Sequence, residues 1–211
     1  PESPKKGVKY PLVLFLHGAG ERGDNNHAQT KNGVYAFCET VNLEKYPCYL
    51  IAPQCPIGQQ WGGLQRGLES VTFDPSTPSE PGRLALELLD KVLQENPDID
   101  RNRIYITGLS MGGFGTIDLL MRRPELFAAA MPLCGGGDIQ YTDKIKNIPI
   151  WLFHGGIDEV VLPAFSRNMY KALKDKGSSV KYTEFSTLGH SMWQETYYNP
   201  AVLDWLFSQH R

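Results

Sequence analysis

The sequence predicts an α/β protein with a mainly parallel β-sheet and helices on both faces, and three observations favour this fold class. Short apolar runs alternate with longer amphipathic stretches along the 211 residues, as strands alternate with crossover helices. Most runs are continuously apolar, which is typical of strands covered on both faces. Several of the amphipathic stretches begin or end at proline or glycine, the residues that bound helices.

The expected elements follow from these runs in order. Six strands are predicted, at 12–16, 49–52, 104–107, 128–133, 148–153 and 180–185. The longest crossover helix starts at the cap residue Ser79, ends at Asn96-Pro97 and carries an apolar stripe formed by Leu84, Leu88, Leu89, Val92 and Leu93. Further helices are predicted at 114–122, 163–174 and 200–208. Segment 53–78 has no periodicity and is predicted to be a long surface loop.

Length and charge restrict the domain organisation and the partners. Residues 1–7 have a linker-like composition, and 8–211 fit a single catalytic domain without a lid. A net charge of −2 from interspersed acids and bases gives no footprint for nucleic acid or an anionic membrane. No apolar stretch approaches the roughly 20 residues that cross a bilayer. Because the chain opens without a leader, we expect a mature or excised module of a larger multidomain chain.

Four cysteines are too few and too scattered for a disulfide scaffold, and their spacings match no zinc site. We therefore expect no metal and no other cofactor. Cys38 and Cys48 are the first pair to test for a disulfide, because they are close in sequence and lie outside the catalytic motifs. Buried free thiols remain the alternative.

The segment Gly108-Leu109-Ser110-Met111-Gly112 matches the Gly-x-Ser-x-Gly nucleophile elbow, in which a reactive serine sits on a sharp strand-to-helix turn. A predicted strand precedes it and a predicted helix follows, which is the context that the motif requires. Glycine is needed at both ends because a side chain there would collide with the returning chain. Ser110 is therefore the candidate nucleophile.

A serine hydroxyl needs a base to take its proton and an acid to orient that base. In this arrangement the chain order is Ser, Asp or Glu, then His, so His154, His190 and His210 are the candidate bases. His210 is next to the end of the chain, and His154 at a strand end is typical of a loop-bracing histidine. His190, in a glycine-containing turn after the last strand, is the predicted base.

Asp158 is the predicted acid because it follows the strand at 148–153 directly. Glu159 is its rival, and adjacency alone does not decide between them. The tetrahedral intermediate also needs two donors fixed in advance. The backbone N–H of Met111 is one, and that of Ala19, in the loop after the first strand, is the other. His17 in the same loop is expected to hydrogen-bond backbone and to transfer no proton.

With these pieces placed, the chain resembles the α/β-hydrolase superfamily, and within it the branch of feruloyl esterases, acetyl xylan esterases and polyester depolymerase-like proteins. The stretches that carry the narrower likeness are Leu16-His17-Gly18-Ala19-Gly20-Glu21-Arg22-Gly23, Ala52-Pro53-Gln54-Cys55-Pro56 and Cys134-Gly135-Gly136-Gly137-Asp138. The resemblance implies the α/β-hydrolase fold and the triad Ser110, Asp158 and His190. It is specific for mechanism and weak for substrate.

These observations predict a serine esterase that acts on feruloyl or acetyl esters of plant cell wall polysaccharide, or on similar small esters, and that is secreted. Trp61 and Trp193 are candidate substrate contacts, because their rings could stack on a sugar or a phenolic acyl group, and equally candidate packing residues. A peptidase or thioesterase would use the same triad. A carbohydrate-binding domain that has lost catalysis is the third alternative.

Overall fold

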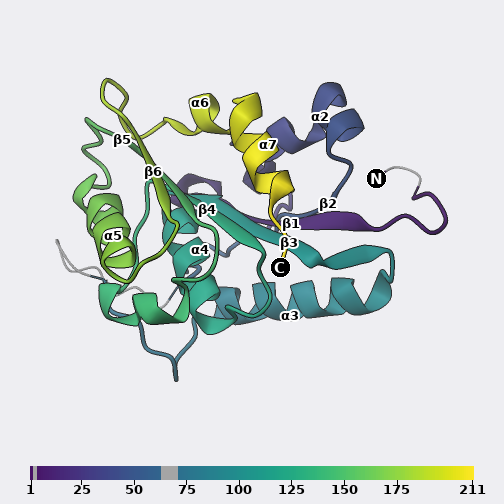
Figure 1. Cartoon of the computed structure of the whole chain (residues 1–211), viewed down its shortest axis with the longest axis horizontal. Coiled ribbons are helices and arrows are strands. Elements are labelled where there is room, and N and C mark those ends of the chain that lie inside the picture. Colours follow the sequence, from purple (N-terminus) through teal and green to yellow (C-terminus); the bar gives the residue numbers. More distant parts are fainter. Residues whose placement is uncertain (2–3, 63–70) are drawn as a thin grey trace.

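Six parallel strands form one sheet at the centre of the molecule in a computed structural model, which describes residues 1, 4–62 and 71–211. The strand order is β2-β1-β3-β4-β5-β6, and every hydrogen-bonded neighbour is parallel. Figure 1 shows the strands fanning with a strong twist. The strands are β1 (Tyr10–Leu16), β2 (Tyr49–Ile51), β3 (Ile99–Leu109), β4 (Ala129–Leu133), β5 (Trp151–Gly155) and β6 (Lys181–Phe185).

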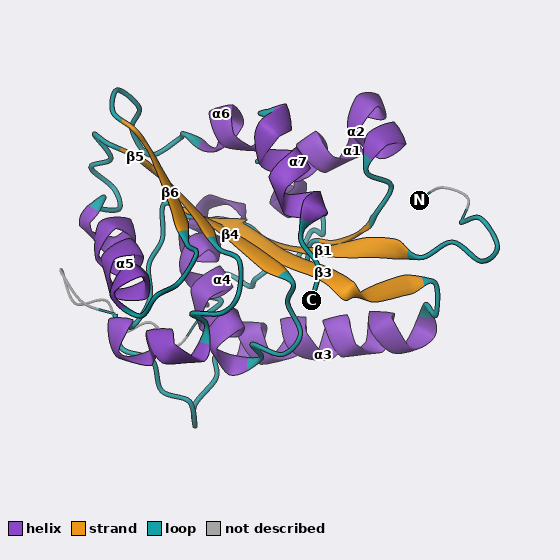
Figure 2. Cartoon of the chain, viewed as in Figure 1, coloured by secondary structure: helices purple, strands orange, loops and turns teal. Residues whose placement is uncertain are grey.

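Helices cover both faces of this sheet, as Figures 1 and 2 show. One face carries α3 (Glu80–Glu95), α4 (Met111–Arg122) and α5 (Ala164–Asp175). The other carries α1 (Val34–Cys38), α2 (Thr40–Lys45), α6 (Trp193–Tyr197) and α7 (Pro200–Ser208). The predicted α/β-hydrolase fold, with its mainly parallel sheet between two helical layers, is confirmed.

Strand β1 shows why its sequence is apolar at every position. All seven of its residues are buried. Leu12, Leu14 and Leu16 belong to the core under α3, α4 and α5, whereas Val13 and Phe15 belong to the core under α1, α6 and α7. Because successive side chains of a strand point to opposite faces, a sheet covered on both sides needs apolar residues throughout.

The structure lengthens the strand predicted at 104–107, which is β3 from Ile99 to Leu109, and shifts the strand predicted at 148–153. Strand β5 begins at Trp151 rather than 148 and continues to Gly155. Pro149 has no N–H to give to a ladder, and the pairing of Ile150 with Ala130 is an isolated bridge outside the strand. The later end places His154 inside the strand.

Helix α3 begins where predicted, since the Ser79 hydroxyl accepts a hydrogen bond from Gly82 N at 3.2 Å. Its buried stripe is shifted from the predicted one. Leu84 and Leu88 are 48% and 38% exposed, whereas Ala85, Leu86, Leu89 and Leu93 face the core. Gly82 and Ala85 belong to this buried stripe, and a Cβ on Gly82 would lie only 2.3 Å from the carbonyl oxygen of Trp61, so the helix packs closely along its small residues.

All four cysteines are free thiols, so the Cys38–Cys48 disulfide is not formed in this structure. Cys38 is exposed, and the other three are buried. Among the described helices, none has the length and apolar character that spanning a membrane would require.

Candidate active site

Ser110 occupies the turn between β3 and α4 in a conformation that few residues adopt, with φ 54° and ψ −115°. The chain comes back on itself there so closely that a Cβ on Gly112 would lie 1.8 Å from the carbonyl oxygen of Leu16. A Cβ on Gly108 would lie 2.5 Å from the same oxygen. The two glycines are therefore required sterically, as the nucleophile elbow predicts.

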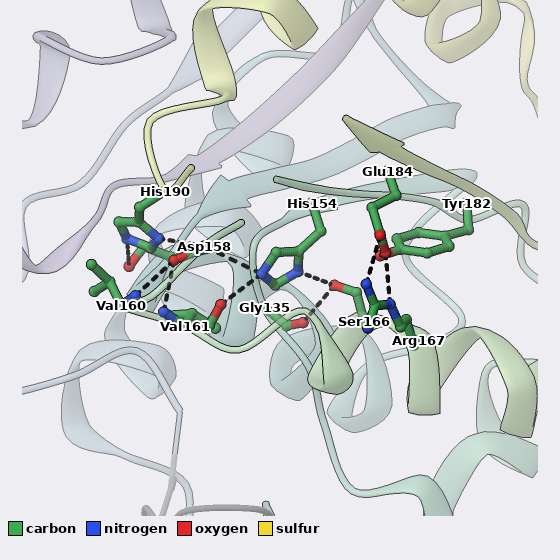
Figure 3. Close-up of polar contacts among 11 residues, drawn as sticks. Gly135, His154, Asp158, Val160, Val161, Ser166, Arg167, Tyr182, Glu184 and His190 are labelled. Atoms are coloured by element: carbon green, nitrogen blue, oxygen red, sulfur yellow. Dashed lines mark hydrogen bonds and ion pairs between the residues drawn. The ribbon is translucent and has the colours of Figure 1, made fainter. Parts of the chain in front are cut away.

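His190 lies beside Ser110 and links it to Asp158. Its Nε2 is 3.0 Å from Ser110 Oγ, and its Nδ1 is 2.7 Å from Asp158 Oδ2. Figure 3 shows the imidazole directed at the carboxylate. The structure thus brings together, at hydrogen-bond distance and in the predicted order, three residues that are far apart in the sequence.

Asp158 is held by its own turn after β5. Its Oδ1 accepts hydrogen bonds from the backbone N–H groups of Val160 and Val161, both at 2.9 Å. The residue is 3% exposed, whereas the rival Glu159 is exposed. Because Asp158 is buried, is held by its own turn and faces His190 with its other oxygen, the geometry favours Asp158 over Glu159 as the partner of His190.

The hydrogen bonds of the two remaining candidate bases go to groups other than Ser110. His210 is exposed, and its ring contacts the backbone carbonyl of Ser208 at 3.3 Å. His154 is fully buried, with its ring nitrogens 2.7 Å from Ser166 Oγ and 2.9 Å from the Val161 carbonyl oxygen. Burial lowers the pKa of His154, which favours a neutral ring. The expectation that His154 braces a loop agrees with these contacts.

The two predicted oxyanion donors lie at the starts of helical turns. Met111 is the first residue of α4, and Ala19 is the first of the 3₁₀ turn Ala19–Glu21, so neither N–H has a carbonyl partner within its own turn. A Cβ on Gly18 would lie 2.8 Å from Leu109 Cδ1, which places the Ala19 loop against the elbow. The oxyanion role itself stays a prediction.

His17 braces that loop as a neutral ring. Its Nε2 accepts the N–H of Cys55 at 2.9 Å, so Nδ1 carries the proton and donates to the Gly18 carbonyl at 2.6 Å. Burial lowers the pKa of His17. Its own carbonyl accepts the indole N–H of Trp61 at 2.9 Å. Both ring nitrogens of His17 are thus occupied by backbone groups, which agrees with the expectation that His17 transfers no proton.

The two candidate tryptophans have different surroundings. Trp61 is 1% exposed and packs on α4, where a Cβ on Gly115 would lie 2.4 Å from it. Its ring has no free face, so the structure favours its packing role over substrate stacking. Trp193 is partly exposed and meets His190 edge to face, with ring centroids 5.6 Å apart. Of the two, Trp193 therefore stands where it could touch a substrate.

Cys134 lies in the site, although sequence reasoning did not assign it there. The potential ligand atoms of Cys134, Asp158 and His190 all lie within 4.8 Å of one another. The signal for this position is its location at the end of β4, the strand next to the elbow. Burial raises the pKa of the Cys134 thiol, and a protonated thiol is a poor metal ligand.

Comparison with known proteins agrees with this geometry. Residues 2–199 match the family model described as phospholipase/carboxylesterase. The chain belongs to this family. It is accordingly a carboxylesterase-type hydrolase, and its α/β-hydrolase fold is the fold that the resemblance in sequence implied.

Several relatives show how far the likeness extends. The probable carboxylesterase SOBER1-like of Arabidopsis thaliana is 26% identical, over 87% of this chain and 74% of the relative. Lysophospholipase-like protein 1 of Mus musculus is also 26% identical, over 85% of this chain and 80% of its own length. The crystal structure of a thermostable esterase matches with a TM-score of 0.92 and 42% identity. All of this chain is covered, but it spans only 58% of that esterase.

Proposed function

We propose that the protein is a serine carboxylic-ester hydrolase that works through an acyl-enzyme. His190 takes the proton of Ser110 as its oxygen attacks the ester carbonyl, and then gives that proton to the leaving alcohol. Water, deprotonated by the same imidazole, releases the acid and restores Ser110. Asp158 holds the imidazole in the required tautomer and stabilises the imidazolium.

The observation that carries this proposal is the hydrogen-bonded chain from Ser110 Oγ through His190 to Asp158, with lengths of 3.0 and 2.7 Å. Asp158 Oδ1 is already occupied by two backbone N–H groups, so Oδ2 is the oxygen left for His190. The exposed fraction of the His190 side chain is 18%, so substrate and solvent can reach the ring. For the oxyanion, we propose the N–H groups of Met111 and Ala19.

For the substrate, our lead is a feruloyl or acetyl ester on a plant cell wall polysaccharide. The position of Trp193 favours a substrate with a planar acyl group or a sugar ring, on which the indole could stack, because Trp193 is partly exposed and adjoins His190. The chain is also similar to poly(3-hydroxyalkanoate) depolymerase C of Paucimonas lemoignei, with 30% identity. The matched region is 60% of this chain and 28% of that protein.

A thioesterase is the second candidate. An acyl-protein thioesterase 1 homolog of Dictyostelium discoideum is 26% identical over 90% of this chain and 89% of its own length. The same triad can cleave a thioester, since the acyl-enzyme is common to both reactions. Parallel rates on thioester and oxygen ester substrates with the same acyl group separate the two candidates.

The test compares native protein, Ser110→Ala and the control Ser191→Ala on p-nitrophenyl acetate and methyl ferulate. Ser191 is exposed in the same loop as His190, so its replacement controls for a general effect of losing a hydroxyl. We expect Ser110→Ala to lose about 10³-fold or more in kcat while it unfolds at the native midpoint. Full activity of Ser110→Ala on both esters would contradict the proposal.

A further inference from the structure

His154 touches the carboxylate of Asp158, although the proposed reaction gives it no step. It lies on β5, and both side chains are completely buried. His154 Nε2 is 3.3 Å from Asp158 Oδ2, the same oxygen that faces His190. Figure 3 shows a continuous line of contacts from His190 through Asp158 and His154 to Ser166.

The contacts of His154 define which nitrogen carries the proton. Nε2 is 2.9 Å from the carbonyl oxygen of Val161, which can only accept, so Nε2 is the protonated nitrogen. The same N–H is shared with Asp158 Oδ2 at the longer distance of 3.3 Å. His154 therefore turns an N–H, and not a lone pair, toward the carboxylate.

Ser166 completes the far side of the ring. Its hydroxyl oxygen is 2.7 Å from His154 Nδ1 and 2.9 Å from the carbonyl oxygen of Gly135. Burial lowers the pKa of His154 and so favours its neutral ring. The one proton of the Ser166 hydroxyl then has two possible acceptors, which are His154 Nδ1 and the Gly135 carbonyl oxygen. When the proton points to Nδ1, it fixes the tautomer in which Nε2–H faces Asp158.

Besides Asp158 and His190, three titratable side chains of the described residues lie around this part of the site: Glu184, Tyr182 and Cys134. Glu184 of β6 pairs in register with His154, but hydrogen bonds from Arg167 at 2.6 and 2.8 Å lower its pKa to about 2. Tyr182 also donates to Glu184, and its pKa is raised by burial. On the Asp158 side, burial raises the pKa of the Cys134 thiol and keeps it protonated.

We propose that His154 is a positioning residue of the reaction, acting through Asp158. Its Nε2–H keeps Oδ2 directed at His190, and the Val161 carbonyl oxygen holds His154 in the tautomer that can do so. Asp158 then has a donor from four directions: two backbone N–H groups on Oδ1, and His190 and His154 on Oδ2. The inference rests on the proposed function, because it assigns His190 as the base.

Losing the His154 donor has two consequences that differ from a loss of stability. The carboxylate gains freedom to rotate away from His190, which lowers kcat without changing how substrate binds. The carboxylate charge is also less dispersed, so it attracts the imidazolium form of His190 more strongly. The acid limb of the kcat/KM profile then moves to higher pH.

The test is a matched pair, His154→Leu and His154→Gln, measured with p-nitrophenyl acetate from pH 5 to 9. Leu fills the space without a donor, whereas Gln can present an amide N–H near the place of Nε2. Active sites are counted with a serine-directed phosphonate, so that kcat is expressed for folded protein only. Ser110→Ala in parallel shows whether the hydrolysis depends on Ser110 at all, which tests the proposed function separately.

We expect His154→Leu to lose about 10- to 100-fold in kcat per active site at unchanged KM, with the acid limb moved to higher pH. His154→Gln is expected to recover most of that loss and to keep the native limb. Native kcat per site and an unmoved acid limb in His154→Leu would overturn the proposal. If this variant does not fold, His154→Met, which also lacks a donor, is measured in its place: a lower kcat per site with a shifted limb supports the proposal, and native values refute it.

Discussion

Replacing Asp158 by Asn is the perturbation for which the structure makes the most detailed prediction. The carboxylate accepts from the N–H groups of Val160 and Val161 on Oδ1 and faces His190 and His154 on Oδ2. An amide offers one acceptor and one donor group. In one orientation the NH₂ group of the asparagine would point at the two backbone N–H groups, and in the other at the N–H groups of His190 and His154. A donor would then face a donor, unless a ring nitrogen gives up its proton.

The less costly orientation keeps the amide oxygen on the two backbone N–H groups, because these cannot change. The NH₂ then faces His190 Nδ1, and His190 can adapt by moving its proton to Nε2. In that tautomer Nε2–H points at Ser110 and cannot take its proton. We therefore expect kcat to fall by about 10³- to 10⁴-fold.

The effect on folding should be small by comparison. In this orientation the favourable 3.3 Å contact between His154 Nε2 and the carboxylate is lost, while Nε2 keeps its hydrogen bond to the Val161 carbonyl oxygen at 2.9 Å. The loss of unfolding free energy is accordingly about 1 kcal/mol, the value of one modest hydrogen bond.

The assay is kcat and KM on p-nitrophenyl acetate, together with urea unfolding of the same preparation. Glu159→Gln is the matched control, because it removes the neighbouring exposed carboxylate, and it should keep native activity. An Asp158→Asn variant with more than about a tenth of native kcat would refute the assignment of Asp158. So would a loss of activity fully explained by unfolded protein.

Two further predictions concern packing and the thiols. Gly112→Ala places a Cβ 1.8 Å from the Leu16 carbonyl oxygen and should lower the unfolding free energy by about 3 kcal/mol in urea melts, whereas Gly20→Ala, with nothing within 4 Å, should be neutral. Equal stability of the two variants would contradict the close approach of the chain at the elbow. In native protein at pH 8, a disulfide-exchange reagent should titrate one thiol, that of exposed Cys38, and all four after unfolding. If all four thiols of the native protein reacted rapidly with the reagent, Cys48, Cys55 and Cys134 could not be buried as the structure shows.

The sheet was predictable because burial on both faces leaves a strong mark on sequence. Strand β1 is apolar throughout for this reason, and the elbow glycines mark the turn that follows β3. The short helices α1, α2 and α6 were not predicted. They are five or six residues long, too short for a helical repeat, and α1 and α6 gain their stability from tertiary contacts such as Phe37 against Tyr197.

The candidate site was predictable to the extent that chain order reports function. Ser110, Asp158 and His190 each follow a strand, and the carboxyl ends of parallel strands meet at one edge. The different places of the two tryptophans could not be foreseen, because Trp61 is buried by contacts with His17 and Gly115 that only the folded chain creates. The contact of His154 with Asp158 was hidden in the same way, since β5 ends later than its apolar run.

The most direct test of the central claim is to find where an acyl-enzyme mimic becomes attached. Native protein is treated with a p-nitrophenyl phosphonate, digested and mapped by mass spectrometry, with His190→Ala alongside. The account predicts one adduct, on the peptide that contains Ser110, formed much more slowly in His190→Ala. Attachment at another residue, or an equal rate without His190, would contradict it.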